Sequence, residues 1–364
     1  MQILAVDIGT GTQDILLYDT NKEPENALQM ILPAPTQIVA RAIQQATQAG
    51  EDILLIGATM GGGPCAWAAR QHIKAGRRVY ATPAAARTFD DDLTEVAEMG
   101  VQIIGEDETR ALRDVRRLIL RDLDMAAIRA AFGAFGVEVR PAAIGVAVFD
   151  HGAAPPGWSD RRFRFEYLTR RLQAEPTLTA LAFMADKVPP QMTRMAAIAA
   201  QAEAGVPLLL MDTPSAAVLG ALEDPVVRRA GDGIFANIGN AHTLAFRLQG
   251  GRVSGLFEHH TGRLTTERLD NWLEALAAGT ISNDAVFEDQ GHGALLLDPQ
   301  PMPLRFLSVT GPRRMLLYGS RHAPYFAVPY GDMMVAGCWG LIRALTVQAP
   351  ELAEAVKLPA GDTR

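Results

Sequence analysis

Cysteine is almost absent from this chain, which has two cysteines among 364 residues. Cys65 and Cys338 lie far apart in the sequence, so they form none of the closely spaced sets that bind zinc or an iron–sulfur cluster. A chain with few cysteines and no paired spacing is typical of a reducing compartment. We therefore expect a cytoplasmic protein without a cysteine-bound metal.

Long hydrophobic runs and an excess of positive charge are also missing. No uninterrupted apolar stretch approaches the roughly 18–20 residues that span a bilayer, and the N-terminus lacks the basic and apolar segments of a signal peptide. The net charge is −7, whereas a nucleic-acid partner usually requires a basic face. The sequence therefore predicts no membrane and no nucleic-acid partner, and the short basic run at 161–164 is interpreted as a solvated patch.

Apolar residues are plentiful, and their order is that of an α/β protein. Hydrophobic residues make up 48% of the chain and charged residues 21%, and the length favours two domains. Apolar runs predict strands at 3–6, 15–18, 26–32, 52–60, 117–120, 142–149, 206–212 and 305–310, with a strand meander at 233–262. Amphipathic periodicity and end signals predict helices at 36–49, 93–99, 125–132, 191–204 and 331–345.

Two turns between strands are unusually rich in small and hydroxylic residues. The first joins the strands at 3–6 and 15–18 and contains Asp7, Gly9, Thr10, Gly11 and Thr12. The second runs from Asn237 to Thr243 within the later meander. An ordinary hairpin needs only one glycine or asparagine at its turn, whereas the backbone N–H groups of glycine turns can converge on an anion that approaches closely. Two such turns in two halves of the chain predict a site that holds a polyphosphate from both sides.

Five segments, in this order, resemble the actin, sugar-kinase and heat-shock-chaperone ATPase superfamily. They are the turn at 7–14, "DTPSAAVLGAL" at 212–222, "NIGNAHT" at 237–243, "SVTGPRR" at 308–314 and "GDMMVAGCWG" at 331–340. The resemblance covers roughly residues 3–20, 51–63 and 205–345. It implies the two-lobed actin-like ATPase fold, which is ribonuclease H-like, with a nucleotide cleft between the lobes. It implies an N-terminal lobe at 1–210 with an insertion at about 66–140, a C-terminal lobe at 211–345, and a polar tail at 346–364.

The resemblance also implies ATP and Mg²⁺ as cofactors, and it places their roles on the matching positions. Asp7 would organise the Mg²⁺ and belong to the catalytic set, together with Asn237 at the start of the second turn. Asp150, which ends a strand where α/β folds place their ligands, is the third predicted catalytic residue. The segment at 308–314 would be the turn on the adenosine side of the nucleotide. Nucleotide contacts are expected from the first turn, the second turn and this adenosine-side turn, at Gly9, Thr10, Gly11, Thr12, Gln13, Gly239, Asn240, His242, Thr243 and Gly311.

Two positions depart from the superfamily pattern. Asn237 stands where many relatives have aspartate, and an amide neither acts as a base nor adds negative charge for Mg²⁺. Pro312 stands where a second glycine is usual. Because phosphoryl transfer depends mainly on positioning and charge neutralisation, the resemblance predicts ATP binding with slow hydrolysis or slow phosphate transfer.

Within the superfamily, the segments at 7–19, 150–152 and 257–262 resemble a prokaryotic group labelled as pyruvate formate-lyase activating proteins. A glycyl-radical activase requires three closely spaced cysteines to bind its iron–sulfur cluster. Two distant cysteines do not supply them, so we expect no radical reaction.

Three kinds of function remain open from the sequence. The chain is a small-molecule kinase with its acceptor near Gly61–Gly63 and a base among Asp150, Asp186 and Asp212, or it is an ATP-driven activator of a partner protein. The third alternative is a catalytically weak nucleotide-sensing or structural module. The sequence leaves the oligomeric state open, with a homodimer as one alternative.

Four further segments are interpreted individually. Adjacent histidines in Glu258–Gly262 point to opposite faces of a strand, which makes a shared metal ion unfavourable. Gly61–Gly63 is either a flexible loop or a point of close backbone approach, and the run at 90–92 is interpreted as a solvated acidic face. The resemblance makes the segments at 212–222 and 331–340 the two helices that connect the lobes. The helix at 331–345 contains the small residues Ala336, Gly337 and Gly340. They indicate either close packing against the other connecting helix or simply a core helix.

Overall fold

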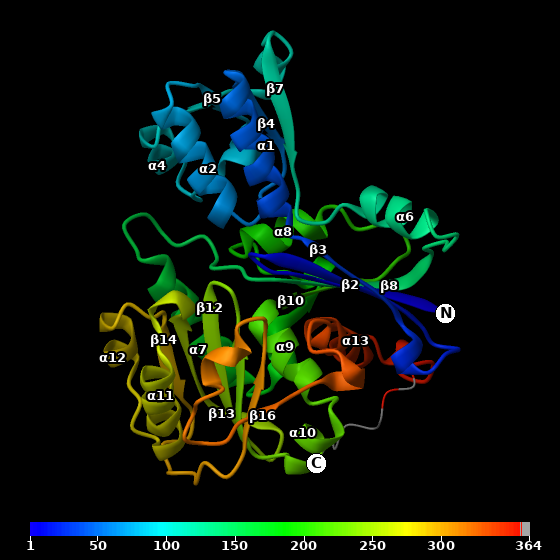
Figure 1. The fold of residues 1–364 in the computed structure, drawn as a ribbon, viewed down its shortest axis with the longest axis vertical. Coiled ribbons are helices and arrows are strands. Elements are labelled where there is room, and N and C mark those ends of the chain that lie inside the picture. Colours follow the sequence, from blue (N-terminus) through cyan, green and yellow to red (C-terminus); the bar gives the residue numbers. More distant parts are fainter. Residues whose placement is uncertain (357, 359–364) are drawn as a thin grey trace.

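Two sheets of matching topology form the scaffold of this computed structural model, which describes residues 1–356 and 358 (Figure 1). The first sheet has the strand order β3-β2-β1-β8-β10-β9. Its strands are β1 (Gln2–Ile8), β2 (Thr12–Asp19), β3 (Leu28–Pro33), β8 (Pro141–Val148), β9 (Ala182–Met184) and β10 (Leu208–Asp212). Three strands, β1 to β3, form an antiparallel meander, and β1 pairs with β8 in parallel.

The second sheet repeats this plan in the order β14-β13-β12-β11-β15-β16. Its strands are β11 (Gly233–Ile238), β12 (His242–Gln249), β13 (Arg252–His260), β14 (Gly293–Leu296), β15 (Leu307–Thr310) and β16 (Tyr325–Phe326). Here β11, β12 and β13 form the antiparallel meander, and β11 pairs with β15 in parallel. A duplicated sheet of this topology, with helices between the two copies, is the two-lobed actin-like fold, so the predicted fold class is confirmed.

Two helices, α9 (Thr213–Ala221) and α13 (Ala336–Gln348), lie between the sheets and pack against each other. A Cβ atom at Gly220 would clash with the carbonyl oxygen of Ala336, and one at Gly340 would clash with that of Ala216. The predicted close packing through small residues is therefore confirmed. Although α13 follows the second sheet, its buried residues Trp339, Leu341 and Leu345 share a core with residues of β1, β8 and β10.

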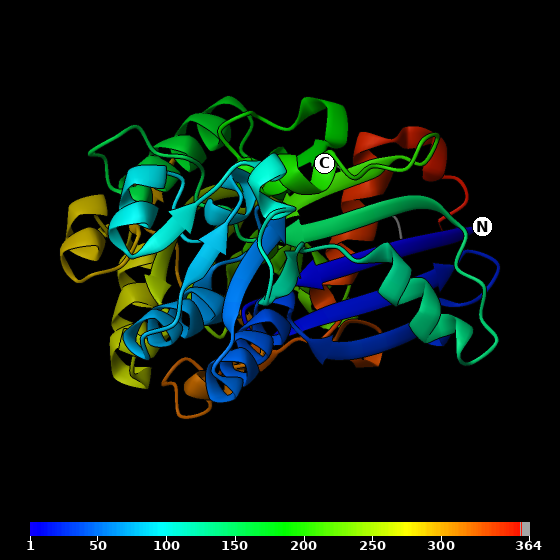
Figure 2. The same cartoon turned by 90° about the horizontal axis from the view of Figure 1, so that it is seen from above.

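A third unit projects from the first lobe and carries its own parallel sheet, in the order β6-β5-β4-β7 (Figures 1 and 2). Its strands are β4 (Asp52–Gly57), β5 (Val79–Ala81), β6 (Val101–Ile103) and β7 (Val115–Leu120), and its helices are α1 (Pro35–Ala49), α2 (Gly63–Lys74), α3 (Pro83–Ala86), α4 (Leu93–Glu98) and α5 (Glu106–Thr109). This corrects the expectation that 51–63 belongs to the scaffold and that the insertion begins near 66. Since β4 pairs with β5 and β7 rather than with the first sheet, the inserted unit begins with α1.

The remaining helices cover the lobes. They are α6 (Met125–Gly133), α7 (Asp160–Ala174), α8 (Thr193–Ala199), α10 (Pro225–Ala230), α11 (Thr266–Ala278) and α12 (Asn283–Glu288). The predicted tail at 346–364 begins inside α13, and residues 357 and 359–364 of it lie outside the described residues. No helix in the described part of the chain is long and apolar enough to cross a membrane.

Candidate functional site

The two predicted glycine turns have the same local structure and lie against each other. The Gly9 amide donates to the Thr12 carbonyl oxygen at 2.9 Å, and the Gly239 amide donates to the His242 carbonyl oxygen at the same distance. A Cβ atom on Gly11 would lie 2.5 Å from Nδ2 of Asn240. Turns contributed by separate lobes therefore meet at one place, and a side chain at position 11 would have to displace the Asn240 amide.

A crevice of about 70 Å³ opens between these turns. Eight of the predicted site residues line it: Asp7, Gly9, Thr10, Thr12, Asn237, Gly239, Asn240 and Gly311. The backbone of Gly311 has a φ of +100°, and a Cβ atom there would lie 2.6 Å from Oδ1 of Asn237. Position 311 thus requires glycine for two reasons: its backbone has a positive φ, and the second glycine turn lies too close to leave room for a side chain.

Strand register explains why two of the predicted contacts, Gln13 and Thr243, lie elsewhere. Asp7 pairs with Asp14 across the first hairpin, and Ile8 pairs with Gln13. Because side chains alternate between the two faces of a strand, Gln13 points away from the crevice, and its Nε2 donates to the Pro33 carbonyl oxygen at 3.0 Å. In this structure Gln13 therefore lies outside the crevice, and the phosphate contact expected of it stays a prediction.

The second hairpin repeats this arrangement, so Thr243 occupies the position equivalent to Gln13. Thr243 is fully buried, and its hydroxyl is 3.0 Å from that of Thr261. His242, the equivalent of Thr12, lines a neighbouring cavity and stacks on Phe149 with the ring centroids 4.2 Å apart. Neither side chain lines the crevice, and the nucleotide contacts expected of both stay predictions.

Asp7 and Asp14 place two buried carboxyl groups on the wall of the crevice. In the described part of the chain, Oδ1 of each has no hydrogen-bond partner. Burial raises the pKa of Asp14 to about 7 and, together with the Asp14 charge, raises the pKa of Asp7 well above its usual value. Unpaired buried carboxylates are costly unless a cation neutralises them. Carboxylate oxygens with room for water are the ligands that Mg²⁺ prefers, so the donor set fits this ion.

Gly337 of α13 keeps the space around Asp7 free. A Cβ atom at this position would clash with Oδ2 of Asp7. The glycine therefore lets the connecting helix approach the carboxylate without displacing it.

A larger cavity, of about 300 Å³, lies beside the crevice where the inserted unit meets both lobes. Gly9 and Thr10 line both cavities, so the first turn forms their common wall. The rest of the lining comes mainly from four segments: Thr59–Pro64, Arg87–Asp91, Phe149–Gly152 and the pair Ala241 and His242. The polar side chains include both carboxylates and arginines.

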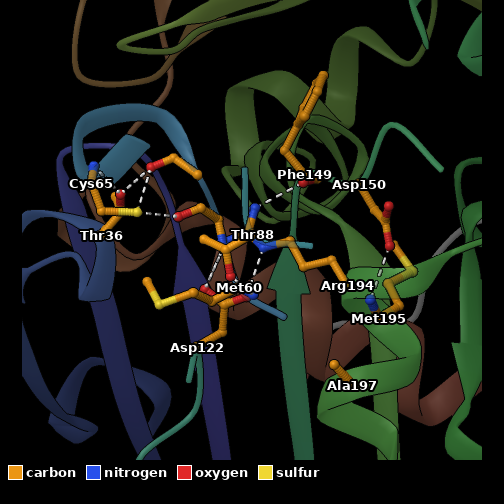
Figure 3. Close-up of polar contacts among 12 residues, drawn as sticks. Thr36, Met60, Cys65, Thr88, Asp122, Phe149, Asp150, Arg194, Met195 and Ala197 are labelled. Carbon is orange, nitrogen blue, oxygen red and sulfur yellow. Dashed lines mark hydrogen bonds and ion pairs between the residues drawn. The ribbon is translucent and has the colours of Figure 1, made fainter. Parts of the chain in front are cut away.

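The glycine loop Gly61–Gly63 is anchored to both the inserted unit and the first lobe, and Figure 3 shows the nearby side chains of Thr36, Asp122 and Arg194. Arg194 pairs with Asp122 at 2.7 Å and donates to the Phe149 carbonyl oxygen at 2.8 Å. Asp122 in turn accepts from the Gly61 amide, and Thr36 donates to the Gly62 carbonyl oxygen at 2.6 Å. A Cβ atom at Gly61 would collide with the Arg194 side chain, and one at Gly62 with the Thr88 backbone. These glycines therefore allow the loop to lie directly against Arg194 and Thr88.

Asp150 is held in place by two backbone amides. Its Oδ1 accepts from Gly152 and its Oδ2 from Met195, each at 2.9 Å, and Figure 3 shows the second contact at the start of α8. Although burial raises its pKa, both oxygens are engaged in fixing the turn. This geometry favours a positioning role over the predicted catalytic one.

Asp91 is a better-placed carboxyl group in the same cavity. It is half-buried, and within the described chain its Oδ1 has no hydrogen-bond partner. Burial, aided by the neighbouring Asp90 charge, raises its pKa. The interpretation of 90–92 as a solvated acidic face therefore holds less well for Asp91, which no local pattern distinguishes from its neighbours.

Behind this cavity, Arg164 of α7 joins the two lobes. It pairs with Asp212 of the first lobe at 2.8 Å and with Glu258 of the second lobe at 2.9 Å, and it donates to the Asp150 carbonyl oxygen at 3.0 Å. All three charged side chains are buried. Asp212, one of the predicted base candidates, is thereby engaged in an ion pair, and Asp186 is exposed.

Replacing Arg164 with methionine is expected to lower the free energy of unfolding by about 3–5 kcal/mol, because it leaves two buried carboxylates without their cation. Chemical denaturation would measure this. Arg170→Met, on the exposed side of the same helix, is the control and should change stability by less than about 1 kcal/mol. Equal effects of the two substitutions would contradict a structural role for the buried ion pairs.

The histidines of the Glu258–Gly262 segment point to opposite faces, as predicted. His259 approaches the Asp289 carbonyl and carboxylate oxygens at 3.1 and 3.2 Å. His260 lies on the other face, near His242 and His292. Burial and neighbouring cations lower the pKa of His151 to about 3, and also lower the pKa values of His242 and His292.

The sequence matches the family described as "Putative pyruvate format-lyase activating enzyme (DUF1786)" over residues 60–316. The chain belongs to this family. The match confirms the resemblance to the prokaryotic group expected from the sequence. It covers the second hairpin, both cavity-lining loops of the inserted unit and α7, and it ends before α13.

Curated proteins give no match to this chain. Among solved structures, the chain is similar to the ethanolamine utilization protein EutJ from Carboxydothermus hydrogenoformans, with 11% identity over 95% of this chain and 89% of that chain and a TM-score of 0.30. It is similar to a ROK hexokinase from Thermus thermophilus, with 14% identity over 96% and 100% of the two chains and a TM-score of 0.31. It is also similar to the activator of the 2-hydroxyisocaproyl-CoA dehydratase from Clostridium difficile with bound ADPNP, with 9% identity over 99% and 100% and a TM-score of 0.30.

Proposed function

We propose that this protein binds Mg-ATP in the crevice between the two hairpins and transfers the terminal phosphate to a small acceptor in the larger cavity. The observation that carries the proposal is that Gly9 and Thr10 line both cavities. A phosphate held by the first turn would therefore lie next to a bound acceptor, and phosphoryl transfer depends on such positioning.

The first lobe supplies the charge at this site. Asp7 and Asp14 would hold Mg²⁺, which when bound neutralises charge on the phosphates and polarises them. The amides of both turns would orient the phosphate oxygens. The second lobe contributes Asn237 in place of a carboxylate, which supports slow rather than fast turnover.

Nucleotide entry would require the lobes to move apart. The crevice of about 70 Å³ is well below the roughly 300–1,000 Å³ of ordinary ligand pockets. The helices α9 and α13 cross between the sheets and are the natural pivot for such a motion. The described conformation corresponds to a closed state.

The acceptor cavity is suited to a small polar molecule with a hydroxyl group. Arg87 can bind an anionic group of the acceptor, while Asp91 is the candidate base for its hydroxyl. The raised pKa of Asp91 brings it closer to neutrality, where a general base works best.

A radical reaction is not part of this proposal. Cys65 and Cys338 are both buried, and they lie in the inserted unit and in α13 respectively. Two cysteines so placed do not provide the three-thiolate set of a radical activase, so we take the activity in the family description as a name and not as a mechanism.

The test is ATP turnover by the purified chain with Mg²⁺, measured across a panel of small polyols, sugars and hydroxy acids. Stimulation by one of these compounds, with formation of its phosphate ester, supports the proposal. Turnover that no small compound changes, but that a co-purifying protein alters, would contradict transfer to a small acceptor. A lack of any thermal stabilisation by Mg-ATP would contradict the nucleotide site itself.

The Asp91→Asn variant is expected to lower acceptor-stimulated turnover by about 10²–10⁴-fold, because it removes the candidate base. Thermal stabilisation by Mg-ATP should be unchanged, since Asp91 does not line the crevice. Glu95→Gln, exposed on α4 nearby, is the control and should retain full activity. Full acceptor-dependent turnover in Asp91→Asn would remove Asp91 from the mechanism.

A further inference from the structure

Three histidines from three distant segments converge beside the acceptor cavity. His151 follows β8 in the first lobe, His242 begins β12 and His292 precedes β14 in the second lobe. One ring nitrogen of each lies within 4.8 Å of a ring nitrogen of the other two. His151 and His242 also line the cavity.

The distance between two of these nitrogens matches shared coordination. Nε2 of His151 and Nε2 of His292 are 3.2 Å apart. Two imidazole nitrogens bound to one tetrahedral Zn²⁺ at about 2.0–2.1 Å would be about 3.3 Å apart. The same distance also allows a direct hydrogen bond between the two rings, and a pair held in this way would bind no metal ion.

A buried carboxyl group stands behind the cluster, with an oxygen that has no partner. Oε1 of Glu258 is 3.6 Å from Nδ1 of His292, and both side chains are fully buried. In the part of the chain that the structure describes, neither atom has a hydrogen-bond partner. A metal ion on Nε2 places the ring proton on Nδ1, where it faces this carboxylate, which is the arrangement that usually supports a metal-binding histidine.

Other contacts orient the cluster and balance its charge. The His242 ring lies parallel to that of Phe149, which is itself stacked on the Arg164 guanidinium at 4.0 Å. The positive charge of Arg164 is paired with two carboxylates, Asp212 and Glu258. The network beneath the histidines therefore does not present an unpaired cation to an incoming metal ion.

We propose that His151, His242 and His292 bind one divalent transition-metal ion. Imidazole ligands favour Zn²⁺ and its first-row neighbours over Mg²⁺ or Ca²⁺, so this site is distinct from that of Asp7 and Asp14. Three protein ligands leave a fourth position open, as in catalytic zinc sites. Because two of the ligands line the acceptor cavity, the open position is available to an oxygen atom of a molecule bound there.

The experiment uses the full chain without a histidine tag, freed of metal with a chelator, loaded with Zn²⁺ and then gel-filtered. Elemental analysis should find about one Zn²⁺ per chain, and loading should raise the melting temperature by about 5 °C. Co²⁺ in its place should give the visible absorption bands of a nitrogen-rich tetrahedral site. Less than about one tenth of an equivalent of Zn²⁺ in the wild type would overturn the proposal.

Variants separate this site from adventitious binding. His151→Gln and His292→Ala should each lose the bound Zn²⁺ and the thermal shift that it causes, while His322→Ala, on the second lobe and outside the cluster, should retain both. His151 is only half-buried, so its variant remains informative if His292→Ala does not fold. Far-ultraviolet circular dichroism and a cooperative melting transition report the integrity of the fold in each case, whether or not the protein binds nucleotide. Wild-type Zn²⁺ content in a folded His151→Gln variant would overturn the proposal.

Discussion

The Asp7→Asn variant is expected to turn over ATP about 10²–10³-fold more slowly than the native protein, the usual loss when a preorganised electrostatic group is removed. Asp7 lines the crevice between the hairpins, and its Oδ1 has no partner in the described structure. The amide keeps the shape of the side chain but removes the charge that would hold Mg²⁺. Steady-state phosphate release at saturating Mg-ATP measures the effect.

Asp19→Asn, at the other end of the same hairpin, is the matched control and should leave turnover unchanged. Asp7→Asn should also fold normally, and in the absence of ligand it should be more stable by on the order of 1 kcal/mol, because a buried and unneutralised carboxylate is removed. Native turnover in a folded Asp7→Asn protein would contradict the assignment of the crevice as the Mg-ATP site.

The Gly220→Ala variant is expected to lose about 2–3 kcal/mol of stability, since its Cβ atom would collide with the backbone of α13 and force the connecting helices apart. For a chain of this size that corresponds to a fall in melting temperature of about 3–4 °C. The same displacement moves Gly337 relative to Asp7, so affinity for Mg-ATP should fall as well. Calorimetry and nucleotide titration measure the two effects.

Gly133→Ala provides the control, because this glycine also lies in a helix, α6, but has open space around its Cα. There the substitution should cost nothing and should gain up to about 0.5–1 kcal/mol. A Gly220→Ala protein as stable as the native one would show that the helices can separate without loss, and the close packing would then have no energetic importance.

The scaffold was predictable from the sequence where local signals were strong. The apolar runs of β1, β8 and β10 and the glycine turns of both hairpins each carry their signal within a dozen residues. The inserted sheet was less accessible because β5 and β6 are three residues long, too short for a periodic pattern. The helix expected from Gly331 instead begins at Ala336, since Tyr330 and Gly331 both have positive φ values that a helix cannot contain.

Site residues were predictable from the sequence only where they lie within a single hairpin. Asp14 could have been found, because the register of a tight hairpin places it directly across from Asp7, and the same alternation would have excluded Gln13. Arg164, Asp91 and the histidine cluster could not, because the groups around them come from separate segments of the chain, as with Arg164 and Asp212, which are 48 residues apart. Such pairs form only when the sheets and α7 are packed, and no local pattern records them.

The two hairpins have the same shape but unequal chemistry. Asn237 and Leu244 occupy the second-lobe positions that correspond to Asp7 and Asp14. Two lobes of the same fold with identical side chains would accept an elongated anion in either direction. Four carboxylates facing one another would also repel that anion. Confining the acidic pair to one half gives the crevice a single polarity. If the crevice holds Mg-ATP as we propose, the metal-bearing end of the nucleotide would dock against the first lobe only, and the terminal phosphate would face one side of the crevice.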